Sequence, residues 1–404
     1  MKILVLVKRF SIDGTDLWLP DDLVHSMLKL GHSVNVVLYD LSGTWEQGEH
    51  IINDKLKVLA IPIDSTCNND MLKKIIIVSK VIFATYRCRK IVSEEYDLSV
   101  GFSMAAFFFL VQKLLKNTSH RTLILWDFYP IHFNEIGKLN SRLLSRLLYW
   151  IENKSIRMHD SVALMTQRNH AFFESYHSNF EGKTFVLPLW QRLDHSAELA
   201  STEEINIEQY KKFIIKTKFN VIFGGQITEG RGVEQIVDIA DRYRNELKNI
   251  NFIIAGDGNL RSGLEERANQ LGLGTVKFVG HLPQERYLDL VKACDATIVI
   301  TVPNVSIPSF PSKALKYMLC KKPIIAAVEE SSDFGEYIEN IAKCGLYSPI
   351  WDMEKLVQNI LRLSNDEELY TLLGTNGHRA LYNLHDVDIV VKNLLKETAL
   401  EDVN

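Results

Sequence analysis

The second half of the chain alternates short, β-branched apolar runs with glycine or polar turns, and this alternation limits the possible folds most strongly. The runs lie within VIFGGQITEGRGVEQ (221–235), FIIAGDGN (252–259), VKFVGHL (276–282), ATIVIT (296–301) and FPSKALKYMLCKKPIIAA (310–327). Such runs, each followed by a turn, are typical of buried parallel strands. The carboxyl ends of these strands meet at one edge of a sheet, where ligands bind. We therefore expect an α/β domain with a ligand site at that edge.

The first half predicts a second doubly wound parallel sheet. Strands are expected at 2–7, 33–40, 56–62, 96–102, 121–127, 161–166 and 184–189, and helices at 19–31 and 73–92. Strands that alternate with helices in this way form parallel sheets. A polar stretch at 193–218 separates the halves as a linker. We expect one domain over 1–195, a second over 196–384, and a last helix over 385–404 that crosses back to the first domain.

Length and composition favour a two-domain protein of ordinary solubility. A chain of 404 residues is too long for one ordinary core, and its apolar content of 46% and charged content of 24% are those of globular proteins. The net charge of -4 argues against nucleic acid as a partner. No segment has about 18 apolar residues in a row, so no spanning helix is predicted. The start, MKILVLVKRF, fits a first strand better than a signal peptide.

The cysteines give no sign of a disulfide framework or a zinc site. They are scattered, odd in number and never paired as CxxC: Cys67, Cys88, Cys294, Cys320 and Cys344. Reduced thiols in a cytoplasm explain this usage most simply.

Two segments carry groups suited to a diphosphate. In GGQITEGRG (224–232), Gly225 lets the backbone approach an anion and Arg231 offers charge-assisted hydrogen bonds. In FPSKALKYM (310–318), Ser312 and Lys313 stand at a helix start, where anions are favoured. The alternatives are a plain strand–turn–helix connection with a surface arginine, and a capped core helix with an exposed lysine.

Other turns leave their role open. Gly256 in AGDGN lies at a strand end, in a tight turn that either contacts the ligand or only turns the chain. His281 in VGHLP follows a strand in a loop whose backbone can meet a purine base or its ribose, or can simply turn. Asp127 in WDFYP ends a strand and could be a base, an acceptor for a sugar hydroxyl, or a helix cap. The loop around Gly14 has one glycine where phosphate-cradling loops often have more. No GxGxxG fingerprint and no P-loop occurs.

The segment GKLNSRLLSRLLYWIENKSIR (137–157) combines basic residues at four-residue steps with many leucines. A basic, aromatic amphipathic helix of this kind can lie on an anionic membrane. The alternative is a core helix with a solvated basic edge.

The order of these motifs resembles the retaining GT-B glycosyltransferases of family 4, especially those of bacterial surface polysaccharide synthesis. The family's G-R-L and K-G pairs correspond to Gly225-Gln226-Ile227 and Arg231-Gly232, and its I-x-G-x-G-P turn to 254–259. Its P-S-K-x-x-E-Y-M helix corresponds to Pro311–Met318. The chain departs from the family where two motif glutamates fall on Pro308 and Lys316, and where Gln226 replaces an arginine.

The resemblance implies a GT-B fold, in which two Rossmann-like domains face a cleft, and a set of site residues. Catalytic roles fall on Asp127, Arg231 and Lys313. Contacts to the nucleotide sugar fall on Gly14, Gly225, Gln226, Arg231, Gly256, His281, Ser312, Lys313 and Lys316. No metal site and no cofactor is expected.

The function implied is transfer of a sugar, with retention, from a nucleotide-diphosphate sugar to a glycan or lipid-linked acceptor. We expect the protein in the cytoplasm or at the inner face of the cell membrane, with a peripheral contact to that membrane. Two alternatives stay open. One is a nucleotide-sugar 2-epimerase on the same fold, and the other is a non-catalytic GT-B subunit or binding protein.

Overall fold

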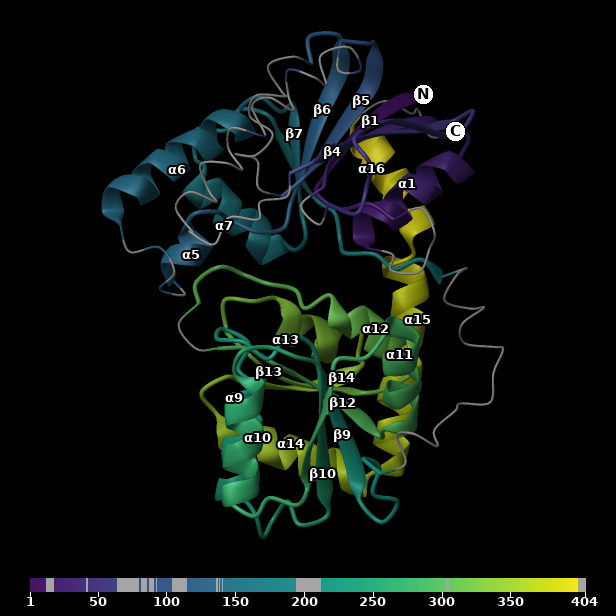
Figure 1. Cartoon of the computed structure of the whole chain (residues 1–404). Helices are drawn as coiled ribbons and strands as arrows, with labels where there is room; N and C mark the ends of the chain where they lie inside the picture. Colours follow the sequence, from purple (N-terminus) through teal and green to yellow (C-terminus); the bar gives the residue numbers. More distant parts are fainter. Residues whose placement is uncertain are drawn as a thin grey trace. The chain divides into compact units, whose positions relative to one another are not determined.

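The computed structural model has two compact α/β units (Figure 1). The first unit comprises Met1–Leu189 with Val387–Asn404, and the second comprises Trp190–Asp386. The sequence placed boundaries after residues 195 and 384. The structure describes residues 1–11, 18–40, 43–63, 80, 86, 91, 93–103, 115–135, 137, 139, 141–193, 212–302 and 305–398. Most of the helix expected at 73–92, most of the linker expected at 193–218, and Cys67 and Cys88 lie outside these residues.

The sheet of the first unit has the strand order β3-β4-β2-β1-β5-β6-β7-β8 and confirms the predicted parallel arrangement. Its strands are β1 (Lys2–Val7), β2 (Ser33–Asp40), β3 (Gly48–Asn53), β4 (Leu56–Pro62), β5 (Tyr96–Phe102), β6 (Thr118–Leu125), β7 (Ser161–Leu164) and β8 (Lys183–Val186). The sequence missed β3, which pairs with β4 in antiparallel fashion. GEHIIN alternates half-buried and exposed residues at the sheet edge, so it lacks the continuous apolar run that marks the inner strands.

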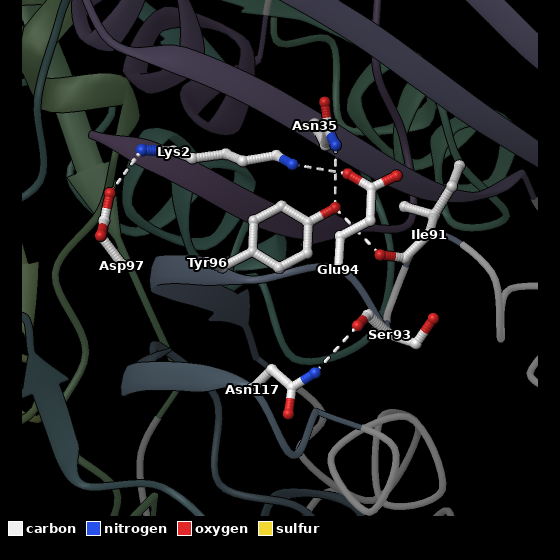
Figure 2. A network of polar contacts seen from close by, with 8 residues as sticks. All are labelled: Lys2, Asn35, Ile91, Ser93, Glu94, Tyr96, Asp97 and Asn117. Carbon is white, nitrogen blue, oxygen red and sulfur yellow. Dashed lines mark hydrogen bonds and ion pairs between the residues drawn. The ribbon is translucent and has the colours of Figure 1, made fainter.

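Hydrogen bonds within the protein link the amino ends of the central strands of this sheet, at the edge that we call the amino edge (Figure 2). The Lys2 amide donates to Asp97 Oδ2 (2.7 Å), and the Lys2 ammonium donates to Glu94 Oε2 (2.6 Å). Asn35 Nδ2 donates to the buried Tyr96 hydroxyl (2.8 Å), and burial raises the pKa of that hydroxyl. These contacts bind β1, β2 and β5 together at one edge, so the opposite, carboxyl edge is the one that can hold a ligand.

The helices of the first unit include the last helix of the chain. They are α1 (Leu19–Lys29), α5 (Ile131–Glu135), α6 (Arg142–Ile156), α7 (Gln167–Tyr176) and α16 (Val387–Glu397). Asp388 of α16 accepts hydrogen bonds from Ser26 Oγ and Lys29 Nζ of α1, each at 2.6 Å. Lys183 Nζ lies 2.8 Å from Glu397 Oε2. These contacts anchor α16 to the first unit.

The second unit has a fully parallel sheet with the strand order β11-β10-β9-β12-β13-β14. The strands are β9 (Phe219–Gly224), β10 (Ile250–Ala255), β11 (Val276–Gly280), β12 (Ala296–Ile300), β13 (Ile324–Val328) and β14 (Gly345–Pro349). Numbered along the unit this is 3-2-1-4-5-6, the order of dinucleotide-binding folds. The strand order reverses between β9 and β12, so the ligand crevice is expected where these two strands end.

Helices surround this second sheet. They are α9 (Glu234–Arg242), α10 (Arg261–Gln270), α11 (Gln284–Ala293), α12 (Lys313–Leu319), α13 (Phe334–Glu336), α14 (Met353–Asn365) and α15 (Glu367–Leu384), with a π-helical turn at Tyr337–Ile341. The amphipathic α9 and α14 bury their apolar faces in one core cluster with the strands. Among the described residues, no helix combines the length and the apolarity that a membrane crossing requires.

Candidate functional site

The end of β9 and the start of α12 bring two predicted site residues together. Lys313, the first residue of α12, holds its Nζ 3.9 Å from the centroid of the Phe223 ring. The same atom lies 3.9 Å from the place that a Cβ on Gly225 would take. An aromatic face stabilises the ammonium group. The segments 221–235 and 310–318, far apart in the sequence, therefore meet at the point where the strand order reverses.

Arg231 completes a positively charged cluster. Burial lowers the pKa of the Lys313 ammonium, and the neighbouring charge of Arg231 lowers it further, to about 7. A like charge acts this way only at short range. The two cations thus repel one another in a partly dry environment, and an anion bound between them would relieve that repulsion.

The glycines of this edge are required by backbone packing. A Cβ on Gly256 would lie 1.8 Å from the Gly225 carbonyl oxygen. The Gly225 amide donates to the Ala255 carbonyl (3.0 Å), and the Gly256 amide donates to the Gly280 carbonyl (2.8 Å). The turns after β9, β10 and β11 are therefore connected to one another. The structural-turn alternative for Gly256 explains this geometry, and a ligand contact there stays a prediction.

A pair of tyrosines that the sequence reading missed supports the end of β9. Tyr317 of α12 is buried, and its hydroxyl accepts a hydrogen bond from the Gly224 amide (3.2 Å). The Tyr287 hydroxyl of α11 donates to the Tyr317 hydroxyl (3.0 Å). Burial raises the pKa of Tyr317 to about 12, so both groups stay neutral hydrogen-bonding partners. The signal was present in the P-S-K-x-x-x-Y-M pattern, where the tyrosine lies on the inner face of the helix.

The start of α12 differs from a capped helix. Ser312 is exposed and adopts helical backbone angles, and its side chain makes no capping hydrogen bond. Leu315 and Met318 are buried. The first turn is therefore held by packing rather than by a side-chain cap, and a ligand role for the Ser312 hydroxyl stays a prediction.

The remaining predicted donor contacts lie around this cluster. Gln226 is exposed in the turn after β9, and His281 is exposed directly after β11. Lys316 Nζ donates to Gln284 Oε1 at the start of α11 (2.9 Å). Lys316 thus has a protein partner, and its predicted contact to the nucleotide sugar stays a prediction. Gly14 lies outside the described residues.

Glu329 is a second residue of this edge that the sequence reading missed. It follows β13 directly and is only 6% exposed. Its carboxylate accepts hydrogen bonds from Thr301 Oγ1, after β12, and from Ser309 Oγ (2.8 Å). It thereby ties the segment that leads into α12 to the sheet. The rule that functional groups follow buried parallel strands would have found it after the run PIIAAV.

The first unit places Asp127 at the carboxyl edge of its own sheet, shortly after β6. Burial lowers the pKa of Lys8, which follows β1, and the charge of Asp127 acts on that pKa in the opposite direction. The negative charge of Asp127 is therefore near enough to Lys8 to act on its ammonium group. Ser103, after β5, receives a hydrogen bond on its Oγ from the Trp126 amide (3.1 Å). This edge thus collects a cation, a carboxylate and a hydroxyl.

The chemistry of both edges is that of charged and hydroxyl groups. In the part of the chain that the structure describes, no group of three His, Cys, Asp or Glu side chains is arranged to hold a metal. Cys294, Cys320 and Cys344 are unpaired.

Comparisons with known proteins give relatives of this chain among the glycosyltransferases. Residues 205–380 match the family profile of the group 1 glycosyl transferases. An uncharacterized glycosyltransferase of Methanocaldococcus jannaschii is 25% identical over 274 residues, which are 66% of this chain and 62% of that protein. The O-antigen chain mannosyltransferase C of Escherichia coli is 20% identical over 302 residues, which are 75% of each chain. The chain thus spans less than two thirds of the first of these relatives.

A solved structure is similar over the whole chain. Alr3699/HepE of Anabaena, crystallised with UDP and glucose, has a TM-score of 0.67 at 16% identity and covers 100% of both chains. The fold of the chain is that of the GT-B glycosyltransferases. The sequence similarity to the group 1 glycosyl transferases lies in its second half.

Proposed function

We propose that the protein transfers a sugar, with retention of configuration, from a nucleotide-diphosphate sugar to a glycan or lipid-linked acceptor in bacterial surface polysaccharide synthesis. The observation that carries this proposal is the position of Lys313 beside Phe223 and Gly225, at the reversal point of the second sheet and near enough to Arg231 for that charge to lower its pKa. A diphosphate is the ligand that two adjacent cations and a glycine-rich turn favour. The UDP complex of Alr3699/HepE and the name of the O-antigen mannosyltransferase support the substrate classes.

The cluster would act on the leaving group. As the bond between sugar and phosphate breaks, negative charge grows on the diphosphate. Protonated Lys313 and Arg231 stabilise that growing charge more than they stabilise the intact donor, and this difference lowers the barrier. Because the two cations repel one another, an anion near both of them is favoured more than it would be by either alone.

The acceptor would use the first unit. Asp127 and Lys8 offer a hydrogen-bond acceptor and a donor of balanced charge, which suits the neutral hydroxyl groups of a glycan. Asp127 is the carboxylate of this edge that can receive a proton from an acceptor hydroxyl. The proposed location is the cytoplasm, at the inner face of the membrane that holds a lipid-linked acceptor.

A specific observation favours one other function, nucleotide-sugar binding without turnover. Lys316 and Pro308 stand where carboxylates are expected, and Lys316 is hydrogen-bonded to Gln284. A cation there cannot accept hydrogen bonds from ribose hydroxyls. The protein would then bind the donor through the diphosphate alone and assist a separate transferase.

The test is a panel of nucleotide sugars in a thermal-shift assay, followed by transfer assays with the donors that bind. Ligands that bind only the folded protein raise its melting temperature. We expect at least one nucleotide-diphosphate sugar to do so and to give an α-linked product from an α-linked donor by NMR. A shift without any product supports the binding protein, and conversion of the free nucleotide sugar supports the epimerase. The absence of any shift across the panel contradicts the proposal.

A further inference from the structure

Helix α6 turns its apolar face away from the core of the first unit. Leu143 is 80% exposed, Leu147 is 52% exposed and Trp150 is 54% exposed. Glu152, Ser155 and Ile156 are the buried residues of the same helix. A surface helix of a globular protein normally has the opposite arrangement, with leucines inward and polar groups outward. The core-helix alternative for residues 137–157 is therefore wrong for this face.

The exposed leucines and the tryptophan form one continuous stripe. Residues 143, 147 and 150 are spaced by four and three, so their side chains lie above one another on one side of an α-helix. A patch of this kind on a soluble protein marks an interaction surface. We call Leu143, Leu147 and Trp150 the outer stripe.

The exposed charges of α6 itself, and of Arg157 directly after it, are positive. Arg142, Arg146, Lys154 and Arg157 are exposed, and Lys154 Nζ lies 6.0 Å from the Trp150 ring centroid. The acidic residue of α6, Glu152, is fully buried on the opposite side. The outward surface of the helix thus presents leucine, tryptophan, arginine and lysine together.

Contacts on the inner side fix this orientation. The Tyr149 hydroxyl donates to the Tyr176 carbonyl of α7 (2.8 Å), and the Tyr149 ring stacks on His177 with 5.6 Å between centroids. The Tyr129 amide donates to Glu152 Oε1 (3.0 Å). Rotating the outer stripe toward the core would break each of these contacts. The outward face is therefore a property of the fold, in which α5, α6 and α7 lie beside one another (Figure 1).

We propose that the outer stripe of α6 and its flanking cations dock on the surface of an anionic lipid bilayer. An interfacial helix places leucine and tryptophan at the boundary of the acyl chains and keeps arginine and lysine among the anionic headgroups. The charge sign and the residue types of α6 match that arrangement. This surface lies outside the proposed donor site, and it deepens the proposed function by naming the lipid surface on which a lipid-linked acceptor would be met.

The test is sedimentation of the full-length protein with vesicles. One set contains phosphatidylcholine alone, and the other contains phosphatidylcholine with phosphatidylglycerol. We expect binding to the anionic vesicles, weak binding to the neutral ones, and weaker binding at high salt. The double variants Leu143→Gln/Leu147→Gln and Arg142→Gln/Arg146→Gln should each lower the partition coefficient by roughly tenfold or more.

Matched controls use residues of the same kind elsewhere. Ile51→Gln removes a side chain that is 68% exposed on β3, and Arg267→Gln/Arg379→Gln removes two exposed cations of the second unit. Both controls should bind vesicles as the wild type does. Trp150→Phe should keep binding but lose the blue shift of tryptophan fluorescence that vesicles cause. Circular dichroism confirms that each variant folds.

Three results would overturn the proposal: equal binding to both kinds of vesicle, equal binding by wild type and both double variants, or no binding at all. A dimer in analytical ultracentrifugation that the leucine variant abolishes, without vesicle binding, would assign the stripe to a second copy of the chain instead. Donor binding is measured separately by thermal shift. If the protein does not bind vesicles but a nucleotide sugar still raises its melting temperature, only the membrane inference is contradicted. If it binds vesicles but no nucleotide sugar raises its melting temperature, only the proposed function is contradicted.

Discussion

The carboxyl edges of the two sheets each carry a lysine whose pKa burial lowers, but the neighbouring charges differ in sign. Beside Lys8 in the first unit stands Asp127, whose negative charge raises the lysine pKa. Beside Lys313 in the second unit stands Arg231, whose positive charge lowers the lysine pKa further. The first edge is balanced in charge, and the second holds an excess of positive charge.

This difference shows that the fold alone does not tell which edge binds the donor and which binds the acceptor. Both sheets are parallel, and the same rule about strand ends locates both edges. The side chains decide what each edge can bind. Two neighbouring cations favour an anion, whereas a cation beside a carboxylate favours a neutral ligand rich in hydroxyl groups. The donor is therefore proposed for the second unit and the acceptor for the first.

The largest expected effect comes from removing the excess charge. Lys313→Ala or Arg231→Ala should lower turnover by roughly 10²–10³-fold, because each side chain stabilises charge that develops on the leaving diphosphate. Steady-state kinetics with the donor found by the binding screen measures this. Lys355→Ala, an exposed lysine of the same unit, is the matched control and should be unchanged. Wild-type turnover in both site variants would show that these cations do not hold the diphosphate.

Removing the negative charge of Asp127 at the first edge should lower turnover by a smaller factor. Asp127→Asn keeps the size of the side chain but removes its charge, and we expect turnover to fall by about a hundredfold if the carboxylate accepts the acceptor proton. Donor affinity should stay the same, since that site lies in the second unit. Separate measurement of kcat and of the donor Kd tests both statements. An unchanged kcat would leave Asp127 as a structural partner of Lys8.

The pH dependence of donor binding should distinguish the two edges further. With a pKa of about 7, Lys313 loses its proton as pH rises above neutrality. Donor affinity should then fall by up to about tenfold per pH unit above this pKa. Calorimetry across this range should also detect proton uptake on binding. Lys313→Arg keeps the charge and should give a flat profile; a profile that stays steep would assign the titration to another group.

The sequence predicted the parts of this comparison that depend on strand ends. The runs before Gly225 and before Asp127 were recognisable because buried parallel strands are continuous and apolar. Lys313 and Arg231 stood out because basic residues near glycine turns and helix starts suit phosphates. The loop that contains Gly14 gave a prediction that falls outside the described residues.

Other features depend on pairs of residues far apart in the chain, and the sequence could not give them. The contact of Tyr317 with the Gly224 amide, and that of Glu329 with Ser309, join segments from different strands. The sequence also could not show whether the leucine face of α6 points toward the core or toward solvent. A helical period shows that a stripe exists, but the neighbours of the helix decide whether the stripe faces the core or the solvent.

The smallest expected effect concerns stability rather than turnover, and it contrasts a buried acid of the first unit with the buried lysine of the second. Burial raises the pKa of Glu152 from its ordinary 4.5 to about 8, so the folded protein keeps this carboxyl protonated at neutral pH. The unfolded chain releases that proton above about 4.5, so the stability that Glu152 contributes is lost as pH rises through about 8. Lys313 has the opposite sign: its folded pKa lies below the ordinary 10.5, so its contribution to stability rises with pH from about 7 upward.

Glu152→Gln isolates the first of these effects, since glutamine can still accept the hydrogen bond from the Tyr129 amide but cannot ionise. Between about pH 6.5 and about pH 8 the neighbouring His177, whose pKa burial lowers to about 4, is neutral in the folded state, and its titration in the unfolded state is the same in both proteins and cancels from their difference. In this window we expect the free energy of unfolding of the wild type to fall with pH relative to that of the variant. Urea denaturation of both proteins at several pH values measures the difference. If the free energies of unfolding of wild type and variant differed by a constant amount across the window, Glu152 would already be ionised in the folded protein. The first unit would then also bury a charged group, and the two units would not differ in this respect.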